Sequence, residues 1–99
     1  MTEAEEAELT QVRGKLLGKT HPFIAGGSGK VMMGDLLEEA IQAAQDRKPA
    51  DAGQALWTAR YMLRDRGNDP AILDPAFRIL GREAKRTEGQ DGGHEPIQP

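Results

Sequence analysis

A lysine that follows a run of glycines is the first feature of this sequence that could bind or transform a substrate. The segment from Ala25 to Lys30 is similar to the phosphate-binding loop of nucleotide hydrolases. That loop requires Gly-x-x-x-x-Gly-Lys-Ser/Thr, because the first glycine begins the cradle and the last hydroxyl holds magnesium. Ile24 and Val31 occupy those two positions here. The motif fails at both ends, and the segment is expected to be a flexible connector.

The side chains that most often carry catalysis or bind metals are scarce. His21 and His94 are the only histidines, Ser28 is the only serine and there is no cysteine. A zinc site would need carboxylates from distant segments, because no His-x-x-x-His or His-x-x-Glu spacing prepares one. Glu38 and Glu39 fall on the polar face of a predicted helix, where carboxylates are normally solvated. We therefore expect no enzymatic activity, no metal and no cofactor.

Two pairs of side chains within Pro49–Gly67 carry the most informative pattern. Trp57 and Tyr61 are four residues apart, as are Arg60 and Arg64, so an aromatic stripe runs beside a basic one on a helix. Such groups suit nucleic acid, where arginine contacts phosphate and aromatic rings stack. They equally suit a protein interface, where Trp, Tyr and Arg are the preferred anchors. In a chain with four aromatic residues, the two rings could also simply belong to the core.

The net charge of -3 conceals an uneven distribution along the chain. Residues 1–46 contain eight acidic and four basic side chains, residues 47–86 contain five acidic and nine basic ones, and residues 87–99 add three acids. A basic segment of this kind indicates a polyanion or an acidic partner. Alternatively, the two halves of one helical bundle neutralise each other. If a polyanion binds, the predicted nucleic-acid-binding residues are Arg47, Lys48, Arg60, Arg64, Arg82, Lys85 and Arg86.

Helical periodicity must place these residues, because the chain offers almost no strand pattern. The apolar spacing predicts helices over residues 3–17, 31–47 and 52–66, and a single turn followed by a helix over 75–86. A loop over residues 18–30 separates the first two helices. The predicted core consists of Leu36, Leu37, Ile41, Leu56, Leu63, Phe77 and Leu80.

Local signals mark where the helices begin and end. Thr2 and Glu5 are spaced as a capping box, in which each side chain bonds the other residue's backbone amide. Asp51 is a plausible cap for the third helix, and Gly67 supplies the left-handed residue that commonly ends one. Two Asp-Pro pairs, at residues 69–70 and 74–75, each indicate a helix start.

These elements predict an all-α fold, a small bundle of three long helices plus a short or broken fourth. Residues 1–86 form a single helical domain, while the composition of residues 87–99 predicts a disordered tail. Four aromatic residues make a thin core, so self-association is an expected way to bury more surface. Without a membrane span, and with an acidic rather than basic start, the chain is expected to be soluble and cytoplasmic.

A family resemblance appears in the same segment. The run Ala-Leu-x-x-Ala-Arg-x-x-Leu-Arg-Asp-x-Gly resembles the signature of the small terminase subunits of short-tailed bacteriophages. In that family a similar helix follows an amphipathic helix and a short polar link, a layout that residues 35–41 and 45–48 fit. Arg66 departs from the asparagine usual in the family, and the double Asp-Pro segment is unfamiliar there. The matching positions are Leu56, Ala59, Arg60, Leu63, Arg64, Asp65 and Gly67.

The resemblance implies a non-enzymatic DNA-packaging factor in the cytoplasm of a bacterial host. Such subunits form helical ring oligomers, recognise viral DNA and regulate a large subunit that carries the ATPase and nuclease. The leading hypothesis is therefore an adaptor that binds duplex DNA and a protein partner, through Trp57 and Tyr61 for the protein, and assembles with itself. The alternative hypothesis is a small helical inhibitor or regulatory protein that binds a host protein.

Overall fold

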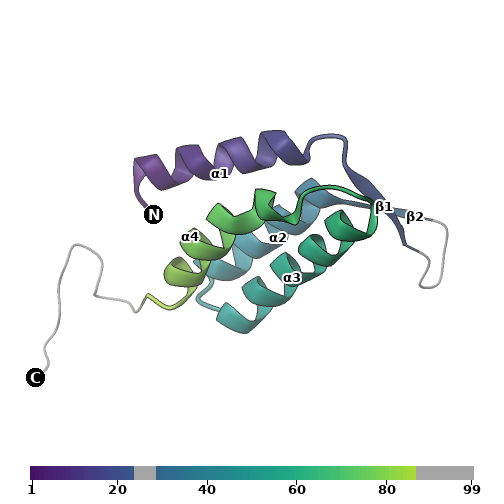
Figure 1. The fold of residues 1–99 in the computed structure, drawn as a ribbon. Helices are drawn as coiled ribbons and strands as arrows, with labels where there is room; N and C mark the ends of the chain where they lie inside the picture. The colour runs from purple at the N-terminus through teal and green to yellow at the C-terminus, as the bar shows by residue number, and fades with distance from the viewer. Residues whose placement is uncertain (24–28, 87–99) are drawn as a thin grey trace, which may run out of the picture.

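A computed structural model describes residues 1–23 and 29–86 of the chain (Figure 1). The predicted all-α class is confirmed, with one small two-stranded sheet added to the helices that the structure describes. The elements are, in chain order, α1 (Glu3–Leu16), β1 (Thr20–Phe23), β2 (Gly29–Met32), α2 (Met33–Gln45), α3 (Pro49–Asp65), the 3₁₀ helix η1 (Pro70–Leu73) and α4 (Asp74–Ala84). The tail expected over residues 87–99 lies outside the described residues, as does most of the glycine-rich loop.

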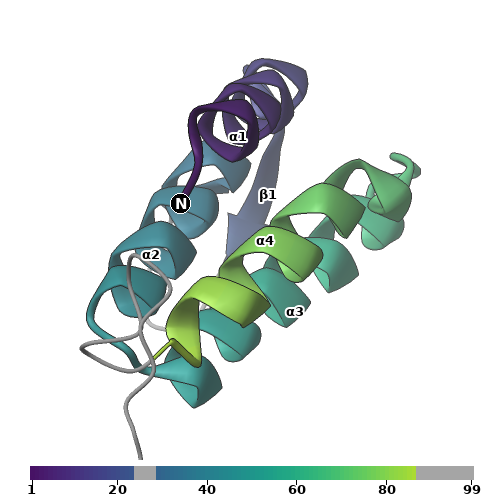
Figure 2. The same ribbon diagram turned by 90° about the vertical axis from the view of Figure 1, so that its left-hand side faces the viewer.

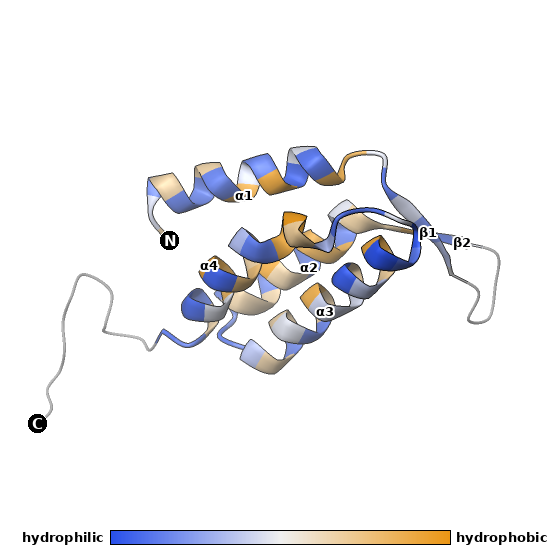
Figure 3. Ribbon diagram, viewed as in Figure 1, coloured by the Kyte–Doolittle hydropathy of each residue, from blue (hydrophilic) through white to orange (hydrophobic). Residues whose placement is uncertain are grey.

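Helix α3 runs back alongside α2, and α4 packs against both of them (Figures 1 and 2). Helix α1 packs against α2 and α4. Its ribbon is mostly hydrophilic, interrupted by the apolar positions Leu9, Val12 and Leu16, which are buried (Figure 3). The bundle is therefore built on three mutually packed helices, α2, α3 and α4, with α1 packed against α2 and α4.

The core contains every large apolar residue that helical spacing placed there. Leu37, Leu56, Leu63 and Leu80 are buried, whereas Leu36, Ile41 and Phe77 are partly buried and pack against the same cluster. Alanines on α2 and α3 fill the space between these two helices and let them approach closely. These alanines are Ala40, Ala44, Ala52, Ala55 and Ala59.

The predicted loop over residues 18–30 was wrong in part, because its ends form an antiparallel hairpin. Strands β1 and β2 pair with Thr20 opposite Met32 and Phe23 opposite Gly29. Thr20, Phe23, Val31 and other strand-prone residues flank the glycine run, which is a weak hairpin signal. The hairpin also delays the start of α2 from residue 31 to Met33, whose amide donates to the Lys19 carbonyl at 3.0 Å.

The helix caps match the sequence signals in part. The Thr2–Glu5 capping box is formed, Gly67 has a φ of 79° at the end of α3, and Asp69 accepts from the Ala71 amide. The prediction of Asp51 as a cap was wrong, because α3 begins at Pro49, whose fixed φ suits the first helical position. Asp74 is likewise no cap, since η1 leads directly into α4.

We expect Leu63→Ala to lower the free energy of unfolding by about 2 to 5 kcal/mol, because Leu63 is buried between helices. Tyr61→Ala is a suitable control, since its side chain is exposed and its loss should cost less than about 0.5 kcal/mol. Urea denaturation followed by circular dichroism measures both. Equal denaturation midpoints for the two variants would contradict the assignment of Leu63 to the core.

Candidate interaction surface

The two aromatic side chains of α3 lie outside the core. Trp57 is 61% exposed and Tyr61 is 64% exposed, whereas Leu56 and Leu63 on the opposite side of the helix are buried. The hypothesis that both rings are core residues is therefore wrong. Large exposed aromatic side chains at helical spacing are the kind of anchor that protein interfaces use.

Trp57 is held in place by α4. Its ring meets the Phe77 ring edge to face, with centroids 5.5 Å apart and an interplanar angle of 70°. The Arg60 guanidinium lies 5.3 Å from the Trp57 ring centroid and 5.7 Å from that of Phe77, and Arg60 Nη1 is 3.9 Å from Asp74 Oδ1. Arg60 is thus packed along the seam between α3 and α4, with its charge still partly exposed.

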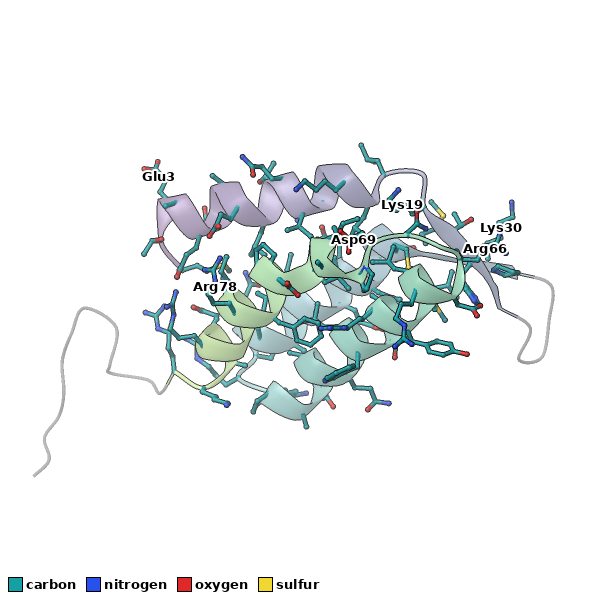
Figure 4. The ribbon with its side chains drawn as sticks, viewed as in Figure 1. Glu3, Lys19, Lys30, Arg66, Asp69 and Arg78 are labelled. Carbon is teal, nitrogen blue, oxygen red and sulfur yellow. The ribbon has the colours of Figure 1, made fainter. Side chains whose placement is uncertain are left out.

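Tyr61, Arg64 and Asp65 line a shallow hollow near the end of α3. His21 of the hairpin contacts one of these residues, with its Nε2 2.7 Å from Asp65 Oδ2. The His21 side chain is only 14% exposed, and its Nδ1 is buried without a hydrogen-bond partner. Lys30 and Arg66 lie at the same end of the molecule (Figure 4). The hairpin therefore braces the end of α3 that carries Arg64.

The seven predicted nucleic-acid-binding residues do not form one continuous edge. Arg60 and Arg64 lie on the second half of α3, beside the start of α4. The others gather at the opposite end, where the α2–α3 turn meets the end of α4. These are Arg47, Lys48, Arg82, Lys85 and Arg86.

Ion pairs engage much of the basic half of the chain. Arg82 pairs with Glu5, and Arg78 Nη2 lies 3.1 Å from Glu8 Oε2, so α4 is linked to α1. These contacts are what the alternative of mutual neutralisation between acidic and basic halves predicts. Lys48 and Lys85 are exposed.

A buried carboxylate that the sequence did not single out organises this end. Glu83 accepts from the Met1 ammonium at 3.2 Å, from Arg47 Nη1 at 3.1 Å and from Arg86 Nη1 at 2.9 Å. Burial raises the pKa of Glu83, but the hydrogen bonds and charges of Met1 and Arg86 outweigh it, so the net pKa lies below the ordinary 4.5. Glu83 follows Ala76, Ile79 and Leu80 at core spacing, a signal that could have revealed its burial.

Arg47 has an unusual backbone conformation, with a φ of 61°. It ends α2 in a Schellman motif, in which the Lys48 amide donates to the Ala43 carbonyl at 2.9 Å and the Arg47 amide to the Ala44 carbonyl at 3.0 Å. Glycine is the usual residue here, because a side chain at positive φ costs about 1 kcal/mol. The contact of Arg47 with Glu83 offsets that cost, although its Nε is buried without a partner.

Among the residues that the structure describes, there is no cluster of three or more potential metal ligands. None of the helices in the described ranges is long and apolar enough to cross a membrane. Lys30 is exposed on β2, while Ser28 and His94 lie outside the described residues. Comparison with protein-family models, curated proteins and solved structures finds no match to this chain.

We expect Arg47→Gly to be more stable than Arg47→Ala by about 1 kcal/mol. Both variants lose the contact with Glu83, but glycine adopts the positive φ without strain. At Lys48, where φ is -118°, the order should reverse, which makes Lys48→Gly and Lys48→Ala the matched control. Urea denaturation tests all four. The same order at both positions would contradict the assignment of strain to residue 47.

We expect Glu83→Gln to lower the free energy of unfolding by about 1 to 3 kcal/mol at neutral pH. A folded-state pKa below the ordinary value stabilises the fold above pH 4.5, and this contribution is lost as the pH falls through the folded-state pKa. The difference in the free energy of unfolding between wild type and variant should therefore become smaller at acidic pH. Denaturation at a series of pH values measures it, with Glu39→Gln as an exposed control. If this difference in the free energy of unfolding stayed constant with pH, the ionised Glu83 carboxylate could not be its cause.

Proposed function

We propose that this chain is a non-enzymatic DNA-packaging adaptor of the kind the small terminase resemblance implies, binding duplex DNA and a protein partner. The observation that carries the proposal is that α3 buries some residues of the family signature and exposes others. Leu56, Ala59 and Leu63 are buried, whereas Arg60 and Arg64 reach the surface beside Trp57. Residues buried in a helical bundle serve packing, so the arginines and aromatics are the ones available for binding.

The surrounding layout supports the same proposal. The signature helix follows an amphipathic helix, α2, after the three-residue link 46–48, as the resemblance implies. The Trp57 and Tyr61 rings offer apolar area to a protein partner, and the neighbouring guanidinium groups offer hydrogen bonds to phosphate or carboxylate. A self-assembled adaptor would also multiply these contacts on a polymer such as DNA.

The alternative function is a small helical regulatory protein that binds a host protein. One observation favours it: Arg47, Arg82 and Arg86 each contact a carboxylate of the same chain, which leaves less free positive charge for a polyanion. Solution mass with and without duplex DNA separates the two functions. A higher oligomer that shifts DNA supports the adaptor, whereas a monomer or dimer indifferent to DNA supports the regulatory protein.

The test of DNA binding is a salt titration. We expect Arg64→Ala to reduce the slope of log affinity against log salt by about one unit, because each phosphate contact releases about one counterion. The double variant Arg60→Ala/Arg64→Ala should lose about two units and weaken binding to all sequences alike. Fluorescence anisotropy of a labelled duplex gives the slopes.

Arg78→Ala is the matched control, because Arg78 is paired with Glu8 and lies outside the predicted set. It should leave the slope unchanged. Identical slopes for the wild type and a folded double variant would exclude this part of α3 as the DNA surface. If the wild type does not bind duplex DNA at low salt, the packaging adaptor is wrong for the isolated chain.

A further inference from the structure

A groove runs between α2 and α3. Its volume is about 550 Å³, and Leu36, Ala43 and Ala55 contribute apolar side chains to its lining. Glu39 and Asp46 of the α2 side and Asp51 of α3 add carboxylates, with Lys48 as the one cation among the lining residues. Gln42, Gln54 and Thr58 complete the lining, so the groove combines three apolar side chains with a net negative charge from both helices.

Helix α1 does not cover this groove. The residues of α2 that face α1, among them Glu38 and Ile41, lie on the opposite edge of that helix from Leu36 and Glu39. Leu36 remains only partly buried, although it packs on the edge of the core. Leu36 and Ala43 are therefore accessible from outside, whereas Ala55 is buried.

The carboxylates of the groove differ from those of α1. Glu5 and Glu8 are paired with arginines of α4, whereas neither Glu39 nor Asp51 forms an ion pair within residues 1–23 and 29–86. Asp46 accepts a hydrogen bond from the neutral Gln42 amide at 3.3 Å. The negative charge at this groove is consequently available to an external cation.

We propose that this groove binds a basic amphipathic segment of the adaptor's protein partner, an inference that rests on the proposed function for the existence of that partner. Apolar side chains of the segment would contact Leu36 and Ala43, and its lysines or arginines would pair with Glu39 and Asp51. Phosphates of DNA are repelled by the same carboxylates. DNA and protein would therefore contact different sides of α3, with Arg60 and Arg64 on the side toward α4.

The test uses a synthetic helical peptide as the probe, with leucines at i, i+3 and i+4 spacing and lysines on both flanks. We expect the full chain to bind the labelled peptide, and Glu39→Lys/Asp51→Lys to weaken binding by about tenfold or more. The same peptide with glutamate in place of each lysine should not bind. Anisotropy at low salt measures the affinities, and circular dichroism checks that each variant is folded.

Glu3→Lys/Glu6→Lys is the matched control, because it changes the net charge equally, but on α1, where both acids lie in the first turn. Its peptide affinity should stay close to that of the wild type. An equal loss in both double variants would mean that total charge, and not the groove, attracts the peptide, which would overturn the proposal. Absence of peptide binding by the wild type would do the same.

Two further measurements separate this inference from the proposed function. Duplex DNA affinity should persist in Glu39→Lys/Asp51→Lys; if no variant binds DNA but the peptide still binds at the groove, DNA packaging fails and the groove assignment stands. Sedimentation of the protein alone tests for a second copy in the groove. A dimer that dissociates in the groove variant would assign the groove to self-association and overturn the assignment to a partner segment.

Discussion

The close packing of α2 against α3 is the constraint on which the rest of the molecule depends. Small side chains such as Ala40, Ala44 and Ala59 leave room for the two backbones to approach, and leucines fill the space on either side. Helix α4 can then pack against both helices at once, and α1 packs against α2 and α4. The same pairing sets the distance between Glu39 and Asp51 across the groove, so the proposed protein site is a by-product of core packing.

The charged residues of this small bundle are paired between α1 and α4 but more open to solvent around α3. Between α1 and α4 the acids and arginines pair with each other, at the edge of the apolar contact that α1 makes with the rest of the bundle. Exposed pairs of this kind each contribute about 0 to 1 kcal/mol, so Leu9, Val12 and Leu16 must supply most of the attachment of α1. Around α3, in contrast, aromatic rings and charged groups remain open to solvent, and the functional proposals concern that region.

Sequence periodicity predicted the helices, the core residues and several caps because these depend on neighbours within about one helical turn. The hairpin was missed, since two strands of four residues around a glycine run leave almost no alternating pattern. The contacts of the arginines were harder to predict than the hairpin. Arg60 and Arg82 look alike in sequence, yet one packs on two aromatic rings and the other meets Glu5, a difference that tertiary placement alone decides.

The left-handed conformation of Arg47 has a consequence for how related sequences can vary. A glycine there would satisfy the turn at no conformational cost but would take one cation away from the buried Glu83. Glu83 would keep its contacts with the Met1 ammonium and Arg86, so the carboxylate would not be left buried without a partner. In related sequences, glycine and arginine should therefore both be accepted at residue 47 while glutamate stays at residue 83.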